Sequence, residues 1–218
     1  MQDIDAILFE PVGSLAEFPP EPFVDIATRV FGRTLAPGIS GSQAYWGVLN
    51  LLEAAVRPPH AHDRAIVEAC ELQAVDRASV YEDGAPALAE LGGLGIRLIA
   101  ASSLSEAALT RFLTQSSLGD AFADRWSRDT AGGLTRALLA KAIAAASLAP
   151  DRVMVLTDTA DGLRTIKQVG ANAILMMNDP DEAMRLSALD PAGGIVSLHE
   201  LPDFVRLVAA ANAWPARL

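Results

Sequence analysis

Three polar residues that could act together in one chemical site each follow a short apolar run of the chain. They are Glu10, Ser102 and Asp158. A carboxylate can serve as a nucleophile, a general acid or a metal ligand, and a serine hydroxyl can hold an anionic group by a hydrogen bond. Ligands of parallel sheets bind beyond the carboxyl ends of the strands. If the three runs are neighbouring parallel strands, these side chains meet at one ligand site.

Four apolar runs are typical of buried parallel strands, because each is short and is followed by turn residues and a helical pattern. These runs cover residues 6–9, 97–101, 153–156 and 173–177, with a candidate edge strand at 194–197. Helical patterns cover residues 85–91, 105–113, 134–146, 163–169 and 201–211. This alternation predicts an α/β fold built on a doubly wound, Rossmann-like parallel sheet.

The segment 17–80 interrupts the alternation. It opens with a cluster of prolines and then shows only helical periodicity, in three stripes separated by proline and glycine breaks. We therefore expect a small helical domain at 17–80, inserted into an α/β core domain made of residues 1–16 and 81–218. Tyr45 and Trp46 lie in this insert, where their helical spacing is more typical of core packing than of a ligand site.

The composition argues against several classes of partner. The net charge of −10 argues against nucleic acid or an anionic membrane surface, since both need clustered Lys and Arg. No apolar run approaches the ~20 residues that span a bilayer. The acidic start of the chain lacks the cationic stretch of a secretory signal. Cys70 is the single cysteine and suits a reducing compartment. We expect a cytoplasmic protein.

The first apolar run and the loop after it carry a family resemblance. Residues 7–15 read ILFEPVGSL. This run resembles the signature loop of the haloacid dehalogenase (HAD) superfamily of phosphohydrolases, which reads hydrophobic-Phe-Asp-x-Asp-Gly-Thr/Ser-Leu. Glu10 matches the nucleophilic aspartate and Val12 the acid/base aspartate, so neither catalytic aspartate is present. The pattern is most similar to the phosphoglycolate phosphatase and β-phosphoglucomutase branch. It implies a HAD-like sheet domain with a small inserted helical cap.

The same resemblance assigns roles to the other polar residues. Ser102 matches the serine or threonine that binds a phosphate oxygen, and Asp158 matches a magnesium ligand. Glu10 could complete a distorted Mg²⁺ site with Asp158, since Mg²⁺ takes oxygen ligands that include one or two carboxylates. The lysine that neutralises the phosphate in the family falls near Gly133, where no lysine stands. Arg128 is the best substitute by position.

Three functions are compatible with these residues. We favour a degenerate phosphatase homologue, a pseudoenzyme that acts by binding a small phosphorylated or anionic ligand or a protein partner. The alternatives are an active but atypical HAD phosphatase that hydrolyses a small phosphate ester through Glu10 or a water, and a structural or assembly subunit. Retention of Ser102 and Asp158 favours ligand binding, whereas loss of both aspartates and the lysine argues against turnover. The fold alone does not decide, because function resides in the site.

Overall fold

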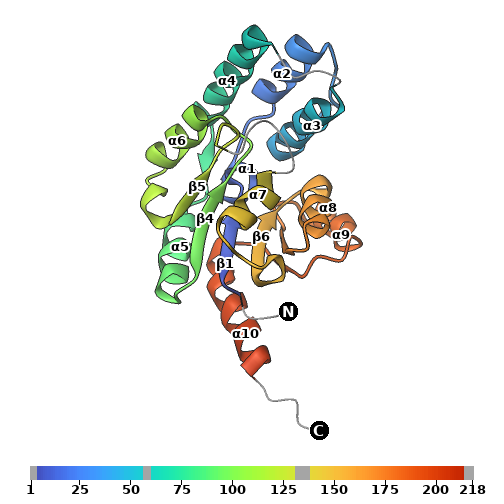
Figure 1. Ribbon diagram of the computed structural model, residues 1–218. Helices are drawn as coiled ribbons and strands as arrows, with labels where there is room; N and C mark the ends of the chain where they lie inside the picture. Colours follow the sequence, from blue (N-terminus) through green and yellow to red (C-terminus); the bar gives the residue numbers. More distant parts are fainter. Residues whose placement is uncertain (1–3, 56–59, 131–137, 214–218) are drawn as a thin grey trace.

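A parallel β-sheet forms the centre of the fold, and β1 (Ala6–Phe9) lies in its middle (Figure 1). Within residues 4–55, 60–130 and 138–213, which the computed structural model describes, this sheet has six strands in the order β5-β4-β1-β6-β7-β8. The other strands are β4 (Arg97–Ala101), β5 (Asp124–Trp126), β6 (Val153–Thr157), β7 (Asn172–Met176) and β8 (Gly193–Ile195). In β1, Phe9 lies opposite Ala100 of β4 and Leu156 of β6. The residues that follow these three strands are therefore brought to one edge of the sheet.

Helices cover both faces of the sheet, because successive side chains of each strand point to opposite faces. The helices of one face are α5 (Gly84–Gly93), α6 (Glu106–Gln115) and α10 (Leu201–Ala213), and those of the other are α7 (Leu138–Ala145), α8 (Ala160–Gln168) and α9 (Pro180–Ser187). Ile7 and Phe9 of β1 belong to the first of the two core clusters, and Leu8 belongs to the second. The strands are thus buried on both sides, which explains why they read as continuous apolar runs.

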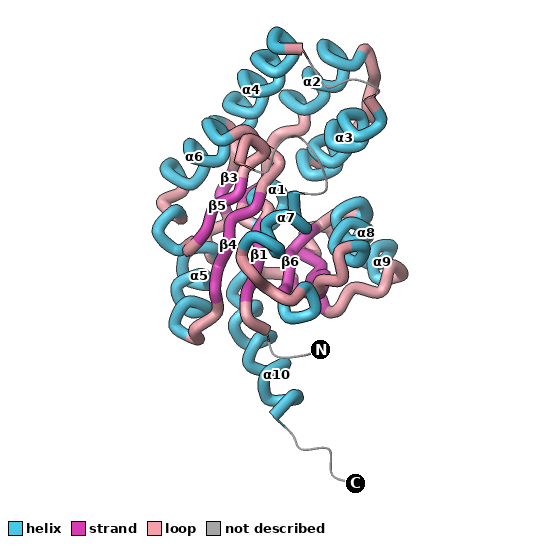
Figure 2. The backbone as a smooth tube through the Cα atoms, in the orientation of Figure 1, coloured by secondary structure: helices cyan, strands magenta, loops and turns pink. Residues whose placement is uncertain are grey.

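Three further helices lie beyond the carboxyl ends of the central strands and form a group that we call the helical insert (Figures 1 and 2). They are α2 (Glu21–Phe31), α3 (Gly41–Ala54) and α4 (Ala61–Asp76). The chain enters and leaves the insert through β2 (Ala16–Glu17) and β3 (Ser79–Val80), which pair antiparallel. These helices fall within the segment 17–80, and our division of the chain into two domains at the ends of that segment stays a prediction.

The loop between β1 and the insert is tightly packed. It contains the short turn α1 (Pro11–Ser14), in which Gly13 has φ +84°, a conformation that favours glycine. A Cβ atom at Gly13 would lie 2.4 Å from Oδ1 of Asp158 and 2.3 Å from Oγ of Ser42. Glycine is therefore required here both by its backbone conformation and by the close approach of the Asp158 side chain.

The predicted α/β class with a parallel sheet is confirmed. Within the six-stranded sheet, β5 was not predicted, because its three residues include Asp124 and Arg125 and form no apolar run. The two-residue strands β2 and β3 were not predicted either. Of the helix predicted at 134–146, residues 134–137 lie outside the described part of the chain, and the rest contains α7. Over the described ranges, no helix has the length and apolar character needed to cross a membrane.

Candidate functional site

The carboxylate of Glu10 accepts hydrogen bonds from two separate parts of the chain. Ser102 Oγ donates to Oε1 at 2.5 Å, and Tyr45 Oη donates to Oε2 at 2.7 Å. The backbone N–H of Ser103 donates to Oε2 at 3.2 Å, and the backbone N–H of Val12 also contributes. Because the two serines follow β4 whereas Tyr45 lies on α3, Glu10 connects the sheet to the helical insert.

Burial is the main influence on this carboxylate, and it raises the pKa of Glu10 from 4.5 to about 7. The hydrogen bonds from Ser102, Tyr45 and Ser103 oppose the rise in pKa without cancelling it. Glu10 therefore changes its protonation state near neutral pH, with hydroxyl and amide donors around it in place of a cation.

Ser102 lies directly after β4 and is fully buried. Its hydroxyl donates to Glu10 and accepts a hydrogen bond of 3.2 Å from the backbone N–H of Leu104. A serine hydroxyl has one proton to donate. The family resemblance implies that this hydroxyl donates to a phosphate oxygen, but in the structure it donates to Glu10 instead.

Val12 lies where the family places its acid/base aspartate, and its side chain is buried in the hydrophobic core. It has no ionisable group and cannot transfer a proton. The hydroxyl of Ser14, the nearest polar side chain in the same turn, donates to the backbone carbonyl of Glu10. The turn that follows β1 therefore offers no replacement for the missing general acid.

Asp158 lies directly beyond β6 and also contacts the insert. Its Oδ2 accepts hydrogen bonds from Ser42 Oγ at 2.7 Å and from Asn178 Nδ2 at 3.3 Å. Its Oδ1 is buried and has no hydrogen-bond partner among the residues that the structure describes. Burial raises the pKa of Asp158 from 3.8 to about 7. The site thus contains two carboxyl groups that titrate close to neutrality.

Arg128, the expected substitute for the family lysine, forms a buried ion pair with Glu71 of α4. Nη2 of Arg128 lies 3.0 Å from Oε2 of Glu71, and Nη1 contacts Oε1. The backbone N–H of Ser105 donates to the same Oε2 at 3.0 Å. The guanidinium group is therefore engaged between insert and core, and its role towards a phosphate stays a prediction. Gly133 lies outside the described residues.

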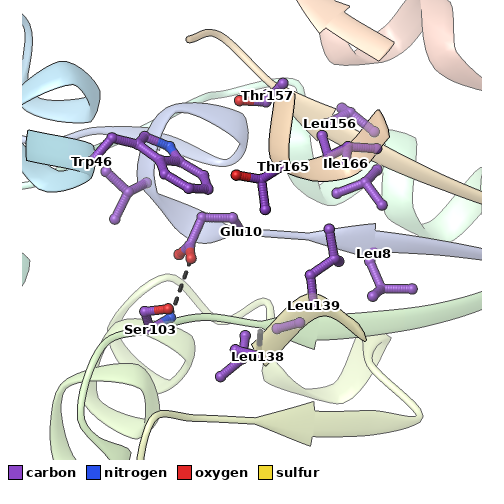
Figure 3. A pocket seen from close by; sticks show the side chains of 13 residues that line it. Leu8, Glu10, Trp46, Ser103, Leu138, Leu139, Leu156, Thr157, Thr165 and Ile166 are labelled. Atoms are coloured by element: carbon purple, nitrogen blue, oxygen red, sulfur yellow. Dashed lines mark hydrogen bonds between the residues drawn. The ribbon is translucent and has the colours of Figure 1, made fainter. Parts of the chain in front are cut away.

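A cavity of about 40 Å³ adjoins Glu10, between the sheet and the helices α7 and α8 (Figure 3). Its walls are mostly apolar and include Leu138, Leu139 and Ile166. The polar lining includes Thr165, whose Oγ1 is buried without a hydrogen-bond partner in the described structure. Leaving such a group unpaired costs about 1–3 kcal/mol. An apolar cavity with a few polar groups is typical of a small-molecule site.

For Tyr45 and Trp46, sequence reasoning favoured core packing over a place facing a cavity under the insert, and the structure shows both features. Tyr45 is buried in the core, but its hydroxyl reaches Glu10, and Trp46 lines the cavity. One general signal could have indicated this for Tyr45, because a buried tyrosine hydroxyl usually needs a polar partner. The identity of that partner depends on how α3 packs against the sheet.

The donor set at this site does not fit Mg²⁺ well. Mg²⁺ requires near-octahedral oxygen ligation, whereas the oxygens of Glu10 already accept hydrogen bonds from hydroxyl and amide groups. Oδ1 of Asp158 is the one carboxylate oxygen of this pair that lacks a donor in the described structure. Within the same residues, no three His, Cys, Asp or Glu side chains are grouped as a metal site needs. The pair Glu10 and Asp158 therefore forms a poor metal site.

Comparison with known proteins identifies the fold. No protein-family model matches the chain, and no curated protein matches it in sequence. Solved structures match over nearly the whole chain. The L-2-haloacid dehalogenase of Xanthobacter autotrophicus has 17% identity and a TM-score of 0.61, covering 93% of this chain and 98% of that one.

Two other solved structures resemble the chain to a similar degree. A predicted phosphoglycolate phosphatase of Haemophilus somnus has 11% identity and a TM-score of 0.65, over 94% of this chain and 99% of its own. The haloacid dehalogenase-like hydrolase SP0104 of Streptococcus pneumoniae has 13% identity and a TM-score of 0.66, with the same coverage of both chains. The structural similarity establishes the fold, and sequence identities this low leave the activity open. The chain has the fold of the haloacid dehalogenase superfamily of hydrolases.

Proposed function

We propose that this protein has lost the phosphoryl-transfer chemistry of its fold and acts by binding a small ligand at the cavity beside Glu10. The observation that supports this most directly is the hydrogen bond from Ser102 to Glu10. It places the carboxylate of Glu10 on the hydroxyl that a substrate phosphate would need. The carboxylate of Glu10 thus takes the hydrogen bond from Ser102 that the phosphate group of a substrate would otherwise accept.

The geometry also opposes covalent catalysis by Glu10. A nucleophilic carboxylate must present a free oxygen to the phosphorus atom, but both oxygens of Glu10 accept hydrogen bonds from the protein. The missing acid/base group at Val12 adds to this, since general acid–base catalysis typically contributes ~10²–10⁴ in rate. The nucleophile and the general acid/base of the family reaction therefore both lack a side chain that could serve in their place.

Charge opposes phosphate binding as well. None of the described residues that line the cavity is Lys, Arg or His. Arg128 is paired with Glu71. An anionic ligand in the cavity would lie beside the carboxyl group of Glu10, and like charges disfavour each other's ionised forms. A phosphate monoester is therefore a poor ligand for this site.

The test is hydrolysis of p-nitrophenyl phosphate with Mg²⁺ by the wild type and by the double variant Glu10→Asp, Val12→Asp. We expect background rates from the wild type. We also expect little turnover from the double variant, because restoring two carboxylates supplies no cation to balance them. Glu10→Ala serves as the control for contaminating phosphatases. A wild-type kcat of ~1–10³ s⁻¹, abolished in Glu10→Ala, would contradict the proposal.

An atypical hydrolase is the second candidate, because the pKa of Glu10 near 7 suits a general acid or base at neutral pH. In that case kcat/KM for a cleavable ester would change with an apparent pKa near 7, and Glu10→Gln would remove both the change and the activity. Absence of any Glu10-dependent turnover across pH 5 to 9 excludes it. Binding of a protein partner and a structural role remain alternatives derived from the sequence.

A further inference from the structure

We propose that the cavity beside Glu10 binds a short aliphatic ammonium ion, with the charged end between Glu10, Trp46 and Thr165 and the alkyl chain in the apolar interior. This inference rests on the proposed binding function and names the class of ligand. Three features of the cavity lead to it: the sign of its charge, an aromatic ring and an unpartnered hydroxyl.

The charge of the lining favours a cation. Glu10 is the one ionisable acid among the described lining residues, and none of them is Lys, Arg or His. A carboxylate that is removed from water is stabilised by an opposite charge nearby. A neutral ligand would leave this charge uncompensated, and an anion would be repelled by it.

Trp46 supplies an aromatic surface for the same cation. Figure 3 shows its indole ring beside the side chain of Glu10, on the same side of the cavity. The face of an indole ring attracts ammonium groups, and the attraction is larger where water is excluded. The neighbouring residue Tyr45 donates to Glu10, so α3 places the ring and the carboxylate together.

Thr165 supplies a hydrogen-bond acceptor that none of the described residues uses. Its side chain is 3% exposed, and within the described residues its Oγ1 has no hydrogen-bond partner. Figure 3 shows this oxygen on the side of Thr165 that faces Trp46. A primary ammonium group has three N–H donors. One of them would satisfy Thr165 while the positive charge lies near Glu10.

The size and chemistry of the interior limit the rest of the ligand. The cavity volume is about 40 Å³, and its inner wall is formed by aliphatic side chains that include Leu138, Leu139 and Ile166. A single water needs about 10–15 Å³, whereas an engineered cavity that binds benzene measures about 150 Å³. An unbranched chain of a few carbon atoms therefore suits the cavity better than a ring.

The experiment compares three probes of matched shape, n-propylammonium, n-propanol and propionate, by isothermal titration and ligand-observed NMR at pH 8. We expect n-propylammonium to bind at least about tenfold more tightly than the other two, as one cation–π contact with a carboxylate nearby allows. Equal affinities for all three probes, or a preference for propionate, would overturn the ammonium assignment.

Variants test the residues that define the site. Glu10→Gln keeps the shape of the side chain and should reduce the preference for n-propylammonium over n-propanol to about threefold or less. Thr165→Val should weaken n-propylammonium and leave n-propanol little changed. Glu182→Gln is the matched control, because Glu182 bonds Gln43 of the insert but does not line the cavity. Unchanged selectivity in both Glu10→Gln and Thr165→Val would refute the assignment even if one variant folded poorly.

The two proposals fail in different ways. Loss of n-propylammonium binding with no phosphatase activity refutes the ligand class and leaves the loss of phosphoryl transfer intact. Tight binding of inorganic phosphate, or Glu10-dependent hydrolysis of p-nitrophenyl phosphate, refutes the proposed function and the ammonium assignment together.

Discussion

The hydroxyl of Tyr45, on helix α3 of the insert, donates a 2.7 Å hydrogen bond to the carboxylate of Glu10, at the end of the central strand. The insert makes a second bond of this kind, from Ser42 to Asp158 at 2.7 Å. Two core carboxyl groups therefore anchor the start of α3. Two of the contacts that join the insert to the sheet domain therefore also engage the carboxyl groups of the candidate site.

Tyr45→Phe should raise the pKa of Glu10 above about 7, because it removes a donor that stabilises the charged form. It should also lower the free energy of unfolding by about 1–3 kcal/mol, because the buried carboxylate of Glu10 loses a donor and the backbone N–H of Ser103 keeps only its 3.2 Å bond to Glu10. The pKa is measured by NMR of side-chain ¹³C-labelled glutamate, and stability by urea unfolding. Tyr81→Phe is the control, because Tyr81 is hydrogen-bonded to Asn178 and is not one of the donors to Glu10. An unchanged pKa of Glu10 in Tyr45→Phe would show that this hydrogen bond is absent in solution.

The stability of the protein should fall as the pH rises from about 4.5 to about 7. The pKa of Glu10 is raised from 4.5 to about 7 in the folded state, so the folded protein binds more protons than the unfolded chain in this range. Asp158 acts in the same direction, from 3.8 to about 7. At 1.36 kcal/mol per pKa unit, the loss is roughly 3 kcal/mol for Glu10 and roughly 4 kcal/mol for Asp158.

Urea unfolding of the wild type and of Glu10→Gln at pH 5 and pH 8 measures how much Glu10 contributes to the pH dependence of stability. The variant should show a smaller difference between the two pH values than the wild type, because glutamine does not titrate. Equal pH dependence in the two proteins would mean that Glu10 is ionised with an ordinary pKa in the folded state.

Breaking the buried pair of Arg128 and Glu71 should destabilise the protein strongly. Removal of one partner leaves an uncompensated buried charge, which typically costs about 3–5 kcal/mol. We therefore expect Arg128→Met alone to lower stability by about this amount, and the double variant Arg128→Met, Glu71→Leu to recover most of it. The pKa of Glu10 should stay unchanged in the double variant. A rise in that pKa would instead indicate that Arg128 acts on Glu10 as the family lysine acts on its nucleophile.

Addition of 10 mM Mg²⁺ should not stabilise the wild-type protein. A ligand that binds only the folded state stabilises it by RT ln(1 + [L]/Kd), so weak binding gives no shift in Tm. Thermal unfolding is compared with and without Mg²⁺ at equal ionic strength. A stabilisation that disappears in Asp158→Asn would show that Asp158 binds the metal after all, through the oxygen that lacks a partner in the described structure.

Some features of this protein were evident from the sequence because they depend on short-range patterns. The strands at Ala6–Phe9 and Arg97–Ala101 are apolar throughout, as strands buried on both faces must be. Parallel neighbours bring their carboxyl ends to one edge. The position of Glu10, Ser102 and Asp158 at one edge of the sheet therefore followed from the strand assignments. The resemblance of residues 7–15 to the haloacid dehalogenase loop followed from the local sequence itself.

Other features were decided by the tertiary structure, because they join residues far apart in the chain. Glu10 and Tyr45 are separated by 35 positions, and Glu71 and Arg128 by 57. No local periodicity specifies such pairs, since they depend on how the insert packs against the sheet. The sequence placed Arg128 near a phosphate and Tyr45 in the core. Packing of α3 and α4 gave each of them a carboxylate partner, because a buried polar group needs a hydrogen-bond partner to offset its lost hydration.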